Sequence, residues 1–234
     1  MTPGVRAVLA GLASGSRVLD AACGVGIDAA ALSRRGFDVV AADESAAMIE
    51  ATTRRLADTD ATAAVVRSRW TELPERLEPA SFDALLCVGN SIAHVRDDAE
   101  MVETLRAFAA MLAPGGIAVV DTHHWSMLAQ LGDVVVEDRV LERGPERARR
   151  RYRWRWSEEP WTCRIDFELD IERANAVDHR THAVVLHPFT TTDLRRNLRA
   201  AGFVDVGLDA RPDDDRYTAV GRAPADATVT LPSR

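Results

Sequence analysis

The sequence contains no lysine, and all 29 of its basic residues are arginine. An enzyme that forms a Schiff base needs a lysine amine, so ordinary pyridoxal-phosphate chemistry is excluded. Cysteine is scarce too: Cys23, Cys87 and Cys163 are widely spaced and form no C-x-x-C pair. The sequence therefore predicts no disulfide framework, structural zinc site or other metal site, and it fits a reducing cytoplasm.

Long apolar runs are also missing. No run approaches the roughly 20 residues that a membrane-spanning helix needs, and the first 15 residues lack the pattern of a secretion signal. The net charge of −7 and the pI near 5.4 do not suit a general nucleic-acid binder. We expect a cytoplasmic protein without membrane or nucleic-acid partners. The lack of lysine, with abundant Ala, Arg, Asp and Val, is typical of a GC-rich coding sequence and suggests a bacterial source.

The 234 residues, 47% of them apolar, suffice for one large domain or one domain with an insertion. In the first half, short apolar stretches alternate with segments of helical composition. Such alternation predicts a parallel sheet that is covered by helices on both faces. The expected strands are 17–20, 37–42, 63–67, 82–88 and 117–120, and the expected helices are 27–35, 45–57 and 97–112.

From Tyr152 onward the apolar pattern has a period of two, which predicts antiparallel strands with one exposed face. Residues 157–160 would form a hairpin turn, a third strand would run from 179 to 187, and a helix and two strands would follow. The alternating arginines of 149–155 and acids of 166–170 can pair across the hairpin. We therefore expect a core at 1–121, an antiparallel insertion at 122–188, a C-terminal completion of the core at 189–222 and a flexible tail at 223–234.

A glycine loop follows the first strand, in Val18-Leu-Asp-Ala-Ala-Cys-Gly-Val-Gly26, and Asp43 ends the second strand. An acid at the latter position is placed to bind the hydroxyls of a ribose. The loop also satisfies the dinucleotide pattern G-x-G-x-x-[G/A]. However, Asp20 and Asp28 would repel a diphosphate, which favours positive potential at a helix start. The cationic, phosphate-free S-adenosylmethionine (SAM) fits this acidic loop better than NAD.

These motifs resemble those of class I SAM-dependent methyltransferases, in family order over roughly residues 17–121. The glycine N-methyltransferase subgroup is the most similar one, notably in Cys87-Val-Gly-Asn-Ser-Ile-Ala-His94. The resemblance implies a Rossmann-like, doubly wound α/β fold. Its sheet would have seven mostly parallel strands, with the antiparallel β insertion after strand five. SAM would be the cofactor, and a small molecule the substrate.

The resemblance also implies roles for single residues. The methionine end of SAM would lie against the glycine loop, the ribose against Asp43, and the adenine beside the third strand. Asn90 would face the substrate, and His94 would buttress its loop. The implied cofactor residues are Asp20, Ala21, Gly24, Gly26, Asp43, Ser45, Met48, Arg69, Trp70, Val88 and His94.

The chain departs from the subgroup on the substrate side. Two residues past Asp121 the subgroup has an arginine that holds the substrate carboxylate, and here that position is His123. A histidine, with an ordinary pKa of about 6.5, is a poor substitute for a permanent cation. The chain also starts 19 residues before Asp20, so we expect little of the subgroup's N-terminal lid. A larger or less anionic amine than glycine is therefore expected.

For the reaction we expect in-line attack of a neutral amine on the sulfonium methyl. Asn90 would orient the amine, and His123 or His124 could accept its proton. O-methylation in secondary metabolism is one alternative, and a catalytically inactive SAM-fold partner subunit is another. The apolar face of the insertion, with Trp154, Trp156, Phe167 and Leu169, must be covered. It would cover the acceptor pocket, a second subunit of a homo-oligomer, or both.

Overall fold

The computed structural model describes residues 2–137, 140–143, 146–173, 176–211 and 214–225. They divide into two compact units. The first unit contains the residues up to Ile92, Asp97–His124 and those from Thr191 onward. The second unit contains Ala93–Arg96 and Trp125–Thr190. Most of the expected tail, 226–234, lies outside the described residues.

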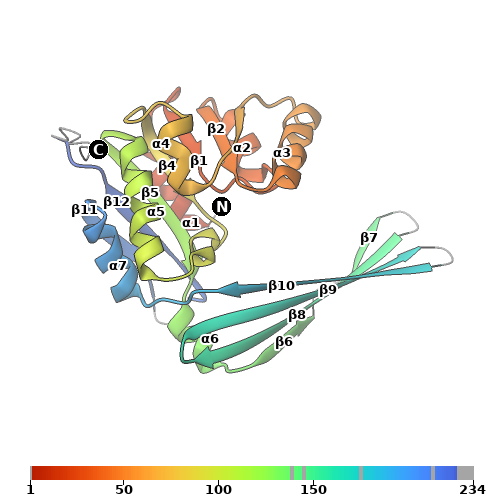
Figure 1. Ribbon diagram of the computed structural model, residues 1–234. Coiled ribbons are helices and arrows are strands. Elements are labelled where there is room, and N and C mark those ends of the chain that lie inside the picture. Colours follow the sequence, from red (N-terminus) through yellow and green to blue (C-terminus); the bar gives the residue numbers. More distant parts are fainter. Residues whose placement is uncertain (1, 138–139, 144–145, 174–175, 212–213, 226–234) are drawn as a thin grey trace. The chain divides into compact units, whose positions relative to one another are not determined.

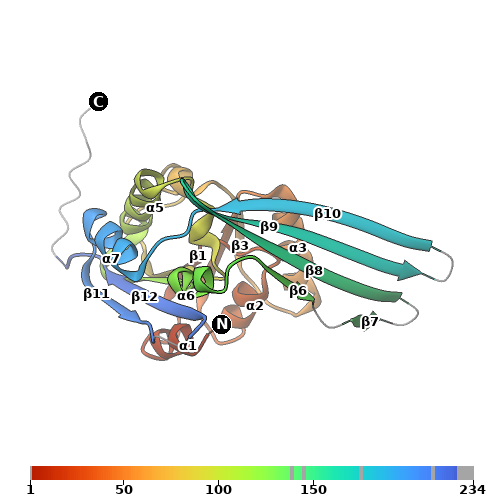
Figure 2. The same cartoon turned by 90° about the horizontal axis from the view of Figure 1, so that it is seen from below.

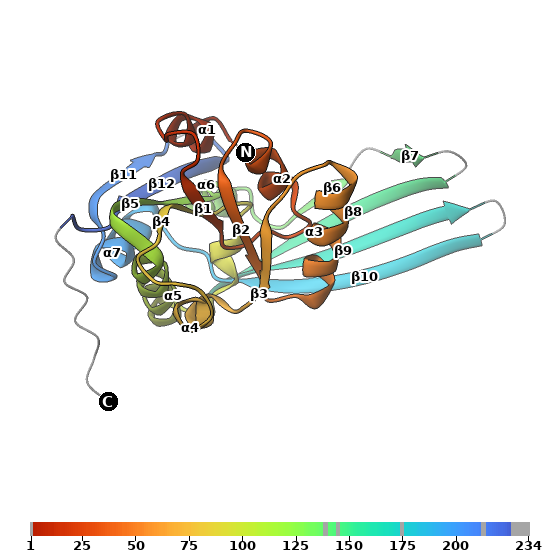
Figure 3. The same ribbon diagram turned by 90° about the horizontal axis from the view of Figure 1, so that it is seen from above.

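The first unit is built on a seven-stranded sheet with the order β11-β12-β5-β4-β1-β2-β3, which Figure 3 shows from above. The five strands from β5 to β3 are parallel, whereas β12 pairs antiparallel with both β5 and β11. This arrangement confirms the predicted doubly wound, mostly parallel sheet. Its strands are β1 (Arg17–Asp20), β2 (Asp38–Asp43), β3 (Ala64–Arg67), β4 (Phe82–Cys87), β5 (Leu112–His123), β11 (Val204–Asp209) and β12 (Arg216–Arg222).

Helices lie on both faces of this sheet (Figure 1). Two of the helices begin after residue types that are typical N-caps. The Ser45 hydroxyl accepts a hydrogen bond from Met48 N–H, and the Asp97 carboxylate accepts one from Glu100 N–H. The first helix was not expected from the sequence. The helices of this unit are α1 (Pro3–Ala10), α2 (Ile27–Ser33), α3 (Ala46–Asp58), α4 (Leu73–Arg76), α5 (Asp98–Met111) and α7 (Thr191–Ala200), with a 3₁₀ turn η1 (Trp70–Glu72).

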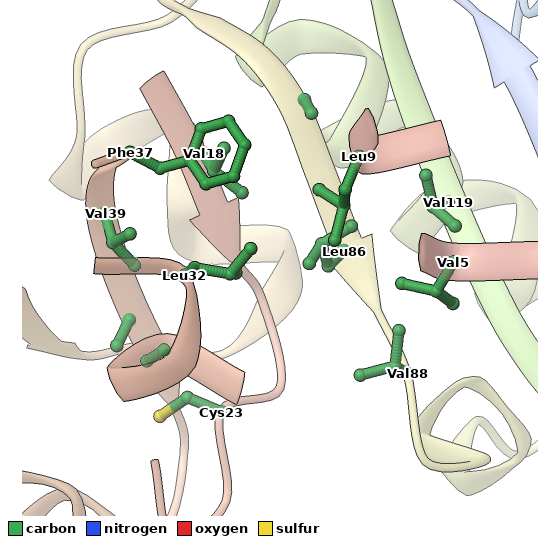
Figure 4. Close-up of a cluster of buried hydrophobic side chains, with 13 residues drawn as sticks. Val5, Leu9, Val18, Cys23, Leu32, Phe37, Val39, Leu86, Val88 and Val119 are labelled. Carbon is green, nitrogen blue, oxygen red and sulfur yellow. The ribbon is translucent and has the colours of Figure 1, made fainter. Parts of the chain in front are cut away.

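A buried apolar cluster joins α1 and α2 to one face of the sheet (Figure 4). Val5 and Leu9 of α1 and Leu32 of α2 are almost fully buried against strand residues such as Val18 and Leu86. A fully buried side chain of this size contributes about 1.5–3 kcal/mol. This packing fixes the carboxyl ends of β1, β2, β4 and β5, where the acidic and polar residues of the predicted site lie.

The second unit is an antiparallel sheet with the order β10-β9-β8-β6, and β7 pairs with β8 (Figure 2). Tyr152 lies opposite Phe167, and Arg151 lies opposite Glu168, so one face is apolar and the other charged. As predicted, arginines and acids pair across the hairpin; Arg151 contacts Glu168 at 3.0 Å. The elements are η2 (Ser91–His94, ending in this unit), α6 (Trp125–Gln130), β6 (Val134–Glu137), β7 (Leu141–Arg143), β8 (Glu146–Glu158), β9 (Trp161–Arg173) and β10 (Ala176–Leu186).

Candidate active site

Asp43 ties two loops together at the end of β2. Its Oδ2 accepts a hydrogen bond from Gly24 N–H at 3.0 Å, and its Oδ1 accepts one from Ser45 N–H at 2.9 Å. The side chain is half-buried. The glycine loop and the start of α3 are thus fixed to one carboxylate, which lies at the strand end where a ribose is expected to bind.

The two loop glycines are needed for different reasons. Gly24 has φ +53°, and a Cβ built there would meet nothing within 4 Å, so its side faces open space. Gly26 has φ +77°, and a Cβ there would approach Thr52 Cγ2 to 2.9 Å. Thr52 in turn donates a hydrogen bond to the Gly24 carbonyl at 2.8 Å. Gly24 therefore leaves room for a ligand, whereas Gly26 allows α3 to pack closely.

Three backbone amides of the loop, those of Cys23, Gly24 and Gly26, already donate hydrogen bonds within the protein. Gly24 N–H binds Asp43, Gly26 N–H donates to the Cys23 carbonyl at 2.8 Å, and Cys23 N–H donates to the Ala42 carbonyl at 3.0 Å. A diphosphate bound at such a loop needs free amides at the helix start. These three amides are therefore not available to a diphosphate.

Asp20 ends β1 and is only 1% exposed. Among the described residues no side chain binds its carboxylate, and the backbone N–H groups of Ala22 and Ala29 compensate its charge only in part. Burial, followed by the negative charge of Asp28, raises the pKa of Asp20 to about 7. A buried carboxylate without a cationic partner is costly. A cationic group on a ligand would compensate this charge. The nearby negative charge of Asp43 also raises the pKa of Asp20.

Trp70 closes the loop from the side of β3. Its indole Nε1–H donates to the Ala21 carbonyl at 2.8 Å, and its ring meets Phe108 of α5 edge-on, with 6.0 Å between centroids. Of the three other residues predicted beside the adenine (Ser45, Met48 and Arg69), Met48 and Arg69 lie at the surface. Met48 is 39% exposed, and the exposed Arg69 has its Nε 3.8 Å from Glu44 Oε2.

The turn after β4 carries Asn90 in the left-handed region, at φ +71°, directly after Gly89 at +74°. Asn90 is 8% exposed, and the neighbouring Val88 is buried. Asn90 Oδ1 accepts hydrogen bonds from Thr122 Oγ1 at 2.8 Å and from His123 N–H at 3.2 Å. Among the described residues, neither of these hydrogen bonds uses the amide Nδ2–H₂ group of Asn90, which is available to another partner.

The end of β5 holds three polar residues. Asp121 is 3% exposed and accepts a hydrogen bond from Arg216 of β12 on Oδ1. His123 lies directly opposite Arg216 in the antiparallel pairing. The His124 ring meets the buried Tyr217 edge-on at 5.7 Å, and burial raises the pKa of Tyr217 well above its ordinary value. The two adjacent histidines therefore have different surroundings.

The structure brings two groups of predicted residues to the carboxyl ends of the parallel strands. One group surrounds the glycine loop: Asp20, Ala21, Gly24, Gly26, Asp43, Ser45 and Trp70. The other follows β4 and β5: Val88, Asn90, His123 and His124. His94 is exposed and belongs to the second unit, so its expected role beside the Asn90 loop stays a prediction.

Sequence reasoning missed Thr52, Arg216 and a role for Asp121. Asp121 had a readable signal, because it directly follows the expected apolar strand 117–120, although β5 continues to His123. Arg216 had none, since 95 residues separate it from its partner Asp121.

Other chemistry is less well supported in the part of the chain that the structure describes. It contains no cluster of three or more metal-ligating side chains, and none of its helices is long and apolar enough to cross a membrane. Cys23 and Cys163 are buried, and burial raises the pKa of each thiol to about 12. Burial likewise raises the pKa of the Cys87 thiol. These thiols are therefore poor nucleophiles at neutral pH.

Comparison with known sequences finds similarity to methyltransferases. Residues 18–116 match the family model described as "Methyltransferase domain". The glycine N-methyltransferase of Mus musculus is 33% identical over 126 residues. That match covers 50% of this chain and 43% of the mouse enzyme, so the chain matches less than half of the length of this relative.

Two solved structures match nearly the whole chain. A SAM-dependent methyltransferase from Clostridium acetobutylicum has a TM-score of 0.79 at 14% identity, covering 94% of this chain and 88% of that one. The sugar N-methyltransferase KedS8 from Streptoalloteichus has a TM-score of 0.76 at 26% identity, covering 94% of this chain and 84% of that one. Similarity to KedS8 extends through the insertion and the C-terminal strands.

Proposed function

We propose that this chain transfers a methyl group from SAM to an amine of a small molecule. Its class I methyltransferase domain matches the family model over residues 18–116. One observation carries the proposal. The adjacent parallel strands β1 and β2 end in Asp20, which is buried without a cationic partner among the described residues, and Asp43, whose two carboxylate oxygens each accept a hydrogen bond from a backbone amide. This pair suits a ligand with a cationic end and a ribose.

The residues that would hold SAM fit its chemistry. Asp20 would neutralise the ammonium of the methionine end, with Ala21, Gly24 and Gly26 lining that part of the site. Asp43 would accept hydrogen bonds from the ribose hydroxyls, and Ser45, Met48, Arg69 and Trp70 would lie around the adenine. Val88 would complete the cofactor side. When bound, SAM supplies a methyl group on a positively charged sulfur, which makes that carbon electrophilic.

The protein has two tasks on the acceptor side: to orient a neutral amine and to take up its proton. The free amide group of Asn90 would bind an oxygen atom of the acceptor and so orient its amine. His123 lies next to Asn90, because its backbone N–H donates a hydrogen bond to Asn90 Oδ1. Burial lowers the pKa of His123, so its imidazole is uncharged at neutral pH and can accept a proton. His124, against Tyr217, is the alternative proton acceptor.

We infer an amine without a carboxylate, and an amino sugar is the first class to test. His123 stands where a carboxylate-binding arginine is expected in glycine N-methyltransferases, which argues against glycine. The match to those enzymes also covers only half of this chain, whereas the match to the sugar N-methyltransferase covers 94%. Amino sugars bear hydroxyls, which an uncharged amide and imidazole can bind.

The test is methyl transfer from labelled SAM to a panel of amino sugars, simple amines and glycine, with the product identified by mass spectrometry. We expect N-methylated amino sugars and little product from glycine. Asn90→Ala should lower turnover by about tenfold or more while cofactor affinity changes little, because Asn90 would face the acceptor and not the cofactor. Efficient glycine methylation would contradict the acceptor assignment, and methylated oxygen would favour an O-methyltransferase. Absence of SAM binding would favour an inactive partner subunit.

A further inference from the structure

Arg216 places a permanent positive charge next to His123. The two residues lie directly opposite each other on β12 and β5, so their side chains share one face of the sheet and their Cβ atoms are about 5 Å apart. The Arg216 side chain is 25% exposed and donates a hydrogen bond to Oδ1 of Asp121, whose side chain is 4% exposed. This buried carboxylate fixes the guanidinium beside the imidazole.

The charged groups around His123 act in opposite directions. Burial lowers the pKa of His123, and the positive charge of Arg216 lowers it further. A hydrogen bond that the ring donates to the backbone carbonyl of Asp215, together with the charges of Asp215 and Asp121, raises it. The lowering effects prevail. Arg216 is the basic group among these neighbours, and without it the charged side chains named here would all be carboxylates.

We propose that Arg216, anchored by Asp121, is a positioning residue that keeps His123 uncharged and able to receive the proton that the acceptor amine loses. This inference rests on the proposed methyl transfer to an amine. The reaction balances as follows. The amine nitrogen forms a bond to the methyl carbon while the carbon–sulfur bond breaks, which leaves one proton in excess on that nitrogen. A ring nitrogen of His123 takes this proton and later passes it to water.

The direct test is a histidine NMR titration of the full chain without cofactor, with the His123 signal assigned by its loss in His123→Gln. In the wild type we expect a midpoint below the ordinary 6.5. Arg216→Gln should raise the midpoint by about one pH unit, because a cation is lost and the carboxylates remain. Arg216→Lys should keep it near the wild-type value. Asp121→Asn should lower it further, and this variant tests the inference even if Arg216→Gln does not fold.

Arg222→Gln is the matched control, because Arg222 lies at the other end of β12 and is exposed. It should leave the midpoint unchanged. The acid limb of the kcat profile should move to higher pH in Arg216→Gln, together with the NMR midpoint. Midpoints that stay constant in Arg216→Gln and Asp121→Asn would overturn the inference, even with normal methyl transfer. If the midpoints shift but no acceptor is methylated, the proposed function fails while the control of His123 by Arg216 stands.

Discussion

Asp20 makes the stability of the chain depend on pH. Its pKa is about 7 in the folded chain and 3.8 in an ordinary aspartate, so the folded state keeps a proton that the unfolded chain loses. Stability linked to this group is complete below pH 3.8 and is lost as the pH rises through 7. The unliganded fold is therefore weakened at neutral pH by the same carboxylate that would bind the cofactor.

Comparing the wild type with Asp20→Asn tests this dependence. Between about pH 5 and 7 the free energy of unfolding of the wild type should fall relative to that of the variant, with a slope approaching 1.4 kcal/mol per pH unit. The measurement is urea unfolding without cofactor at several pH values. Parallel curves for the two proteins would show that Asp20 is already ionised in the fold. The variant should also bind SAM more weakly, because it lacks the negative charge.

Asp43 is expected to contribute to cofactor affinity directly. Asp43→Ala should weaken SAM binding by about 1–3 kcal/mol, the usual loss for a charge-assisted hydrogen bond. Calorimetry provides the measurement. Asp38→Ala is the matched control, because Asp38 begins the same strand and is exposed. Equal affinity of Asp43→Ala and wild type, or tighter binding of NAD than of SAM, would contradict the SAM assignment.

At the scale of the element, the glycine loop separates folding from binding. Gly24→Ala adds a methyl group in open space at a left-handed position, so the fold should lose only about 1 kcal/mol. The same methyl group would occupy room meant for the ligand and lower SAM affinity at least tenfold. Gly26→Ala places its methyl group 2.9 Å from Thr52 and should destabilise the fold more.

Thermal unfolding and calorimetry on both glycine variants distinguish these effects. If Gly24→Ala binds SAM normally, the open space beside Gly24 is not part of the cofactor site. If Gly26→Ala is as stable as Gly24→Ala, α3 yields to the added methyl group, and close packing is not the reason for that glycine.

The strands and long helices of the core were readable in the sequence because each has a local signal. Buried parallel strands are continuous apolar runs, and Ser45 and Asp97 mark helix starts. The helices α1, α4 and α6 were not expected, and α1 and α6 show a physical reason. The α1 segment Pro3–Ala10 is short and apolar, and Val5 and Leu9 acquire their role only from long-range packing. In α6, Trp125 is buried by Trp154, Trp156 and Phe189, which are distant in sequence.

At the scale of the whole molecule, the insertion sheet has an apolar face that suits a second copy of the chain. Tyr152 and Phe167 meet edge-on at 5.1 Å on this face, and Val136, which lies opposite Tyr152, is 45% exposed. We expect a homodimer, and Phe167→Glu should shift it to monomer in sedimentation experiments. Thr181→Glu, on the charged face, is the control and should not. A monomeric wild type would contradict this expectation.

The part of the site built from single motifs was predictable, since a strand end, a glycine loop and Asp43 lie close together in the chain. The acceptor side of the site was only partly predictable from the sequence. Asn90 and His123 were placed by analogy of position, but nothing in the sequence pairs Arg216 with Asp121. That pairing depends on the antiparallel return of β12, which is decided by the whole sheet.

The hydrogen bond from the Trp70 indole to the Ala21 carbonyl has a consequence for hydrogen exchange. The indole proton can exchange with solvent only when the glycine loop separates from the tryptophan. Its exchange rate therefore reports the free energy of that local opening. The opening occurs at Ala21, which is proposed to line the methionine site. A bound cofactor that holds the loop closed would slow this exchange in proportion to its affinity, while amides in the sheet that exchange only by global unfolding would report the stability of the whole unit.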